Sequence, residues 1–197
     1  MAHHIYTTDG FILGSIPTGE ANKYIYIFTK NLGFVGANAQ SVRSVSSKLR
    51  YGLQDFSYSQ LSLVRGKNIW RVTNVLPTNN LYESFRSDKE KFLVCANILS
   101  LVKKLVAGEE KNEELFTILS SAFQFLGESK IESEYIKNFE CIVLLRILYS
   151  LGYHGDFLNL KEFTENSSWN DKLLYSMDRH KEEAFREINN AIKESHL

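Results

Sequence analysis

The chain has 197 residues, of which 44% are hydrophobic and 23% are charged, the balance of an ordinary folded protein with one large domain or two small ones. No stretch approaches the roughly 18 apolar residues that a membrane helix requires, and the N-terminus lacks the regions of a signal peptide. We therefore expect a cytoplasmic protein. The neutral total hides a division, because residues 1–80 carry a net charge of +5 and residues 81–197 a net charge of −5. The basic half is the candidate for binding a polyanion.

The first 80 residues have the alternation and the β-branched and aromatic content of short strands. A glycine in the first strand indicates a β-bulge, and the last two strands are predicted to form a hairpin around Gly66 to Asn68. Five strands in so short a stretch can bury both faces of their sheet by closing into a small OB-fold-like barrel. The predicted strands are 6–16, 23–30, 33–42, 57–66 and 67–76.

After Pro77 the hydrophobic period changes from two to about 3.6, which predicts helices. The first helix has a capping box at Ser87–Glu90 and an apolar face formed by Phe92, Ala96, Leu99 and Val102. The next two run from Glu113 to Gly127 and from Ser133 to Gly152, and the 177–197 tail is again amphipathic. The apolar face of the second helix is Leu115, Phe116, Leu119, Ala122, Phe123 and Leu126, and that of the third is Ile136, Phe139, Val143, Ile147, Leu148 and Leu151. The predicted fold is α+β and multi-domain, with a barrel over residues 1–80 and an all-α domain over 81–197.

Motifs for catalysis, metal binding or nucleotide binding are absent from the sequence. It has no glycine-rich phosphate loop, no metal-ligand spacing of His and Cys, and no nucleophile elbow. Cys95 and Cys141 lie inside apolar helical patterns, as buried structural thiols do. We expect no catalytic residue, no metal and no cofactor, and binding is favoured over catalysis. The alternative is an enzyme with His154 at the centre of its active site. Full activity of a variant in which His154 is substituted would argue against this alternative.

Residues 41–56, SVRSVSSKLRYGLQDF, form the most basic stretch of the barrel half, and its serines predict a flexible, hydroxyl-rich loop. Leu49, Leu53 and Phe56 are expected to pin this loop to the barrel. Basic residues beside aromatic ones suit single-stranded nucleic acid, and we expect two or three of seven aromatic side chains to be exposed, with Trp70 facing inward. The candidate DNA-binding residues are Lys23, Lys30, Arg43, Lys48, Arg50, Arg65, Lys67 and Arg71.

Several weak motifs in a fixed order resemble the RecO family of bacterial DNA repair proteins. The barrel half has Gly19-Glu20, Thr29-Lys30 followed by Gly33, Ser47-Lys48-Leu49, Leu53-Gln54-Asp55-Phe56 and Arg65-Gly66. The helical half has NEELFTILSSAFQFL and FECIVLLRILYSLGYHGDF, which are similar to two helices of that family.

The resemblance implies a nucleoid-associated protein that binds single-stranded and duplex DNA and anneals complementary strands. It also implies cooperation with the single-strand-binding protein (SSB) and with RecR to load the recombinase RecA. A cation for the acidic SSB tail could come from Lys103, Lys104 or Arg146. The zinc cysteines of many members are missing after Leu151-Gly152-Tyr153, so we expect a metal-free form. The alternative function is a protein-interaction adaptor whose barrel does not bind DNA.

Overall fold

A computed structural model describes residues 4–67, 69–153 and 158–195 of the chain. The chain divides into two compact units. The first unit contains residues Met1–Arg86 and Val106–Glu113, and the second contains Ser87–Leu105 and Glu114–Leu197. A short segment between two helices therefore belongs with the strands.

Five strands close into a barrel in the order β1-β2-β3-β5-β4. Neighbouring strands are antiparallel except β3 and β5, which run parallel and pair only at Ala37↔Trp70 and Asn38↔Arg71. The five predicted strands, the hairpin and the OB-fold-like α+β architecture are confirmed. The strands are β1 (Ile5–Thr18), β2 (Asn22–Thr29), β3 (Gly33–Ala39), β4 (Ser57–Arg65) and β5 (Trp70–Asn80).

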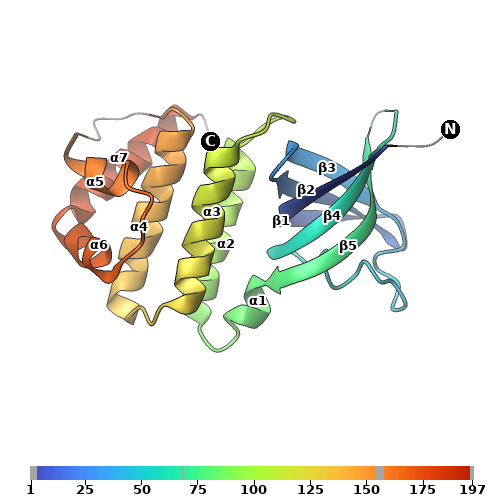
Figure 1. The fold of residues 1–197 in the computed structure, drawn as a ribbon, viewed down its shortest axis with the longest axis horizontal. Helices are drawn as coiled ribbons and strands as arrows, with labels where there is room; N and C mark the ends of the chain where they lie inside the picture. Colours follow the sequence, from blue (N-terminus) through green and yellow to red (C-terminus); the bar gives the residue numbers. More distant parts are fainter. Residues whose placement is uncertain (1–3, 68, 154–157, 196–197) are drawn as a thin grey trace. The chain divides into compact units, whose positions relative to one another are not determined.

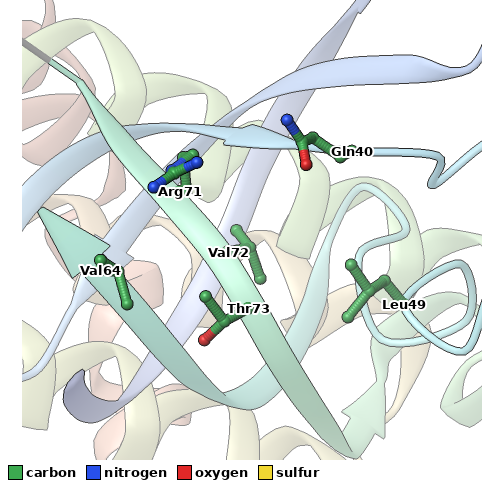
Figure 2. A pocket seen from close by; sticks show the side chains of 6 residues that line it. All are labelled: Gln40, Leu49, Val64, Arg71, Val72 and Thr73. Carbon is green, nitrogen blue, oxygen red and sulfur yellow. The ribbon is translucent and has the colours of Figure 1, made fainter. Parts of the chain in front are cut away.

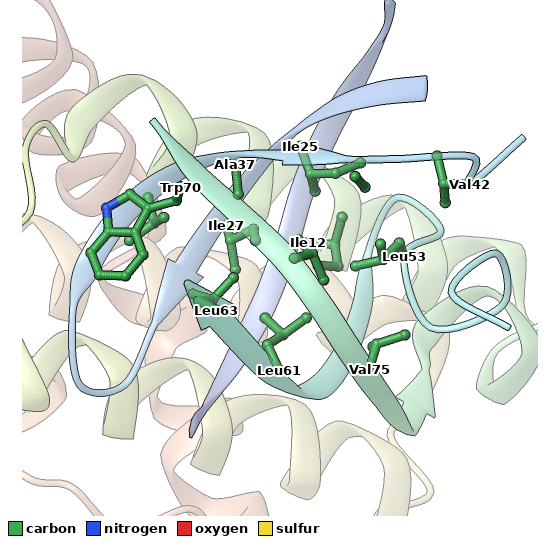
Figure 3. Packing of buried hydrophobic residues seen from close by; sticks show 13 residues of the cluster. Ile12, Ile25, Ile27, Ala37, Val42, Leu53, Leu61, Leu63, Trp70 and Val75 are labelled. Carbon is green, nitrogen blue, oxygen red and sulfur yellow. The ribbon is translucent and has the colours of Figure 1, made fainter. Parts of the chain in front are cut away.

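The barrel core follows from the period of two along the strands (Figure 3). Ile25 and Ile27 on β2 point inward with no exposed surface, while Tyr26 between them points outward and is half-buried. The first strand is long enough to pair with both β2 and β4. Its register shifts between Ile12 and Gly14, the bulge that the sequence predicts, and Gly14 has a φ of 143°. A bulge bends and twists a strand, as closure of the barrel requires.

The helical unit is built around one central helix, α4, which contacts α2, α5, α6 and α7 (Figure 1). Because it has neighbours on several sides, α4 buries residues all around its circumference rather than on the single face that the spacing suggests. The elements of this unit are α2 (Lys89–Leu105), α3 (Glu113–Glu128), α4 (Ser133–Ser150), α5 (Lys161–Thr164), α6 (Asp171–Ser176) and α7 (Lys181–Glu194). Short 3₁₀ turns lie at Leu158–Leu160 and Met177–Arg179, and α1 (Leu81–Ser84) belongs to the first unit.

Two predictions about helix ends are wrong, namely the cap of α2 at Ser87 and the end of α3 at Gly127. The carboxylate of Asp88, rather than Ser87, caps α2 by accepting a hydrogen bond from the Lys91 N–H at 3.1 Å. Gly127 lies inside α3, which continues to Glu128. Gly152 does end α4, because its φ of 83° lets two backbone N–H groups turn back to the last carbonyls.

The buried face of α2 is also displaced from the predicted one. Val94, Cys95 and Ile98 are buried together with Leu99 and Val102, whereas Phe92 and Ala96 are only half-buried. The predicted face of α3 is confirmed residue by residue. Among the described helices, none is both long and apolar enough to span a bilayer.

Candidate nucleic-acid interface

The segment between β3 and β4, residues 41–56 (the basic connection), is a series of hydrogen-bonded turns. Backbone N–H groups of Ser44, Ser47 and Arg50 each donate to the carbonyl three residues earlier. Ser41 and Phe56, at its two ends, adopt left-handed conformations with φ of 53° and 66°. The basic connection is thus a shaped segment, in contrast to the flexible loop that its serines predict.

Apolar side chains anchor the basic connection in the barrel. Leu53 is 1% exposed and Leu49 packs beside it against the core, as the sequence predicts, and Val42 adds an anchor that the sequence analysis missed. Gly52 lies so close to β5 that a Cβ atom there would be 2.6 Å from Cγ2 of Val75. These contacts fill the barrel wall where β3 and β5 have stopped pairing (Figure 3).

Three of the predicted DNA-binding cations line one pocket, which we call the basic pocket. Lys23 on β2 and Arg43 and Arg50 on the basic connection surround a volume of about 260 Å³. Val42, Leu53 and Gln54 complete the lining. Lys23, which is 20 or more positions from the two arginines in sequence, therefore lines the same cavity as they do, and three cations around one cavity suit a phosphate group.

Hydrogen bonds orient two of these cations. Lys23 Nζ donates to Ser15 Oγ at 3.0 Å, and Ser15 Oγ donates to Asp55 Oδ1 at 2.7 Å. Arg43 donates from one terminal nitrogen to the Gly19 carbonyl at 3.2 Å, which leaves its other N–H groups for a ligand. The side chain of Arg50 makes no hydrogen bond or ion pair with any residue that the structure describes.

The other predicted cations of the barrel are exposed but lie outside the basic pocket. Lys30, Lys48 and Lys67 are solvent-facing, and Arg71 lines a separate pocket on β5. Arg65 is held in an ion pair, with 3.4 Å between its guanidinium and Glu109 Oε2, and it stands 5.4 Å from the centre of the Trp70 ring.

Glu109 belongs to residues 106–113, the acidic connection, which packs on the barrel. The other carboxylate oxygen of Glu109 accepts a hydrogen bond from Trp70 Nε1 at 2.9 Å, and the Gly108 carbonyl accepts one from the Phe34 N–H at 3.1 Å. Gly33, with a φ of 68°, lies directly against the backbone of Glu110, where a side chain would overlap. The acidic connection adds three glutamates and one lysine to the barrel unit and so lowers its positive charge.

The aromatic side chains of the barrel are mostly not free for stacking. Trp70 is 4% exposed and points inward while Arg71 points outward, as predicted. Tyr51, at 52% exposed, is the one exposed side chain among the seven candidates, so the prediction of two or three exposed aromatics is wrong. The seven are Tyr24, Tyr26, Phe34, Tyr51, Phe56, Tyr58 and Trp70. Tyr24, Tyr26 and Phe34 are half-buried and form a row on the outer face, with ring centres 5.2 and 6.1 Å apart.

The three candidate cations of the helical unit lie in different environments. Lys103 and Lys104 are in the last turn of α2, half-buried and exposed respectively. Arg146 is 3% exposed, donates to the carbonyls of Phe163 and Ser168, and stacks on Trp169 at 4.1 Å. Burial lowers the pKa of Arg146 to about 10. A guanidinium held in this way stabilises the helical unit and is not presented at the surface, because its N–H groups are directed at the backbone.

No group of three or more His, Cys, Asp or Glu side chains among the described residues is arranged to hold a metal ion. Burial raises the pKa of the Cys141 thiol to about 11 and that of Cys95 further. His154 lies outside the described residues.

Both halves of the chain match models of one protein family. Residues 1–81 match the family described as recombination protein O N terminal, and residues 86–159 match recombination protein O C terminal. The chain belongs to the RecO family. The first RecO match covers the barrel with its basic pocket, and the second covers α2, α3 and α4.

Curated relatives agree with this assignment. The chain is 32% identical to the DNA repair protein RecO of Alkaliphilus metalliredigens over 66% of its own length and 52% of the relative's. It is 30% identical to that of Thermodesulfovibrio yellowstonii over 78% of its own length and 60% of the relative's. A relative from Desulfitobacterium hafniense is 25% identical over 88% of the chain. The chain thus spans between about half and three-fifths of the length of these relatives.

Proposed function

We propose that the chain is a non-catalytic DNA-binding protein of recombinational repair, and that its barrel holds single-stranded and duplex DNA by the phosphate backbone. The observation that carries this proposal is the convergence of Lys23, Arg43 and Arg50 in the basic pocket. Lysine and arginine neutralise phosphates and release counterions, so binding of this kind needs no base sequence and weakens as salt rises.

Two features of the pocket support a phosphate as its ligand. Its volume of about 260 Å³ is below the range of about 300–1,000 Å³ that is typical of sites for whole small molecules. Its cations stand on a strand and on a segment anchored by buried side chains, so little ordering is needed when the backbone binds. We place Lys48 at the rim, because it is exposed on the same connection.

The proposal extends to strand annealing and to protein partners. Two strands held on one cationic surface lose much of their mutual repulsion and can pair without an energy source. In this proposal residues 1–80 hold DNA and residues 81–197 hold proteins, and the chain works on the bacterial nucleoid with SSB and RecR to load RecA. Lys103 and Lys104 are the cations proposed for the acidic SSB tail, and Arg146 is left out because it is buried.

The direct test is a titration of a fluorescent single-stranded oligonucleotide with the chain, followed by anisotropy. Reversing three charges of the basic connection, with Arg43, Lys48 and Arg50 changed together to glutamate, is expected to abolish binding at low salt. The matched control places the same three charge reversals at Lys89, Lys161 and Lys172, which are exposed in the helical unit. If both triple variants bind equally well, the assignment of DNA to the basic connection is refuted.

A second candidate function is a protein-interaction adaptor, supported by the acidic connection that packs on the barrel and covers part of its basic surface. An adaptor interface with an apolar centre keeps its affinity at high salt. Binding of a repair protein that persists at 0.5 M salt, with no detectable DNA binding at 50 mM salt, would favour this alternative.

A further inference from the structure

The barrel wall has an opening in its strand pairing between β3 and β5. These strands pair at two positions, and β5 then continues from Val72 to Asn80 with no described strand beside it on that edge. Val42 and Leu53 of the basic connection are buried in one hydrophobic core with Val72 and Val75 of β5. A second pocket, of about 420 Å³, lies at the same seam (Figure 2), and we call it the seam pocket.

The seam pocket combines an aliphatic lining with polar groups. Leu49, Val64 and Val72 supply the apolar surface, and Gln40, Arg71 and Thr73 supply the polar atoms. Figure 2 shows the side chain of Gln40 at the end of β3 across from Arg71, Val72 and Thr73 on β5, with Leu49 on the basic connection.

The polar groups of the seam pocket are available to a ligand. The side chains of Gln40 and Arg71 are exposed and make no hydrogen bond or ion pair with the described part of the chain. Thr73 Oγ1 donates to the Ser62 carbonyl at 3.0 Å, so its oxygen can still accept a hydrogen bond. The amide of Gln40, the guanidinium of Arg71 and the hydroxyl of Thr73 therefore line an apolar surface. The amide and the guanidinium make no hydrogen bond with the described residues.

We propose that the seam pocket receives one base of a DNA single strand whose phosphate occupies the basic pocket, an inference that rests on the proposed DNA binding. A nucleobase is a flat, mostly apolar ring with donors and acceptors on its edge. The aliphatic side chains contact its faces, and the Gln40 amide, with two donors and an acceptor, pairs with its edge. The guanidinium of Arg71 contacts the ring or the adjoining phosphate.

Size and position favour a base over a second phosphate. The seam pocket is larger than the basic pocket, and its volume falls in the range of about 300–1,000 Å³ that is typical of sites for whole small molecules. Leu49 lines the seam pocket and its neighbour Arg50 lines the basic pocket, so one segment of backbone separates the two. Bases in a duplex are paired and stacked, and this subsite therefore acts on single strands.

The test compares two strands of equal length and charge, oligothymidylate and the same backbone built from abasic tetrahydrofuran residues. The full chain is expected to bind oligothymidylate more tightly than the abasic strand. Gln40→Ala is expected to weaken binding of oligothymidylate by about fivefold, the worth of a typical hydrogen bond, and to leave binding of the abasic strand unchanged. Gln60→Ala is the matched control, since Gln60 is also an exposed glutamine of the barrel, on β4.

The outcomes separate the two proposals. Equal affinity for both strands, with Gln40→Ala binding like the parent, would overturn the base site while DNA binding by the barrel stands, and would leave the seam to another ligand such as an extended peptide. A loss that is the same for both strands would also overturn the base site. Absence of binding to either strand would refute the proposed DNA binding and the base site with it.

Discussion

Neutralising Arg43 and Arg50 together, with both changed to glutamine, is expected to weaken binding of single-stranded DNA by about 8-fold at 50 mM salt. Both side chains line the basic pocket, and Arg43 keeps N–H groups available beyond its bond to Gly19. Each phosphate contact on a single strand contributes about 0.7 to the log–log salt slope, which is about 0.9 log units at 50 mM salt relative to 1 M. Both arginines act on the one phosphate in the basic pocket, so losing that contact costs about 0.9 log units.

The same reasoning gives a smaller loss when salt is higher. At 200 mM salt the same contact contributes about 0.5 log units, so the double variant should bind about 3-fold more weakly than the parent. Fluorescence anisotropy at the two salt concentrations measures both ratios, and circular dichroism checks the fold. Lys89→Gln with Lys161→Gln is the control, which should bind like the parent. A loss of equal size at both salt concentrations would refute the electrostatic reasoning, as would no loss at all.

Three further predictions concern the two connections and the buried thiols. Glu109→Gln removes the charge paired with Arg65, so affinity for single-stranded DNA should rise a few-fold at 50 mM salt; unchanged anisotropy titrations would show that this arginine does not contact DNA. Gly52→Val brings a Cβ against Val75 and should lower the free energy of unfolding in urea by about 1–3 kcal/mol. Gly19→Ala creates no such overlap, because nothing lies within 4 Å, so it tests only the cost of a φ of 61°. Burial raises the pKa of Cys141 to about 11, so at pH 8 roughly 0.1% of the thiol is ionised; it should react with a disulfide reagent only after urea unfolding, and fast reaction of the folded chain would contradict its burial.

The barrel was predictable because its signals are local. Ile25 and Ile27 alternate with outward-facing residues, and the hairpin turn lies next to the strands that it joins. The parallel pairing of β3 with β5 was not predictable, since it joins strands that are separated by the whole of β4. For the same reason the seam pocket could not be read from spacing.

The candidate site was predictable in composition but not in arrangement. The charge pattern predicted Lys23, Arg43 and Arg50 as DNA-binding residues, but it also predicted five other barrel cations that lie outside the basic pocket. The hydrogen bond between Trp70 and Glu109 joins positions 39 residues apart, so no local sequence pattern predicts it. A helix with neighbours on several sides hides its charged residues as well as its apolar ones, which is why Arg146 looks like a surface cation in the sequence and is buried in the fold.

The central claim is that the barrel holds single-stranded DNA by its phosphates, and the salt dependence of binding by the unmodified chain tests it most directly. With one phosphate held in the basic pocket by Lys23, Arg43 and Arg50, a plot of the logarithm of the association constant against the logarithm of the salt concentration should fall with a slope of about −0.7 or steeper. A slope near zero, or no binding at 50 mM salt, would contradict the claim.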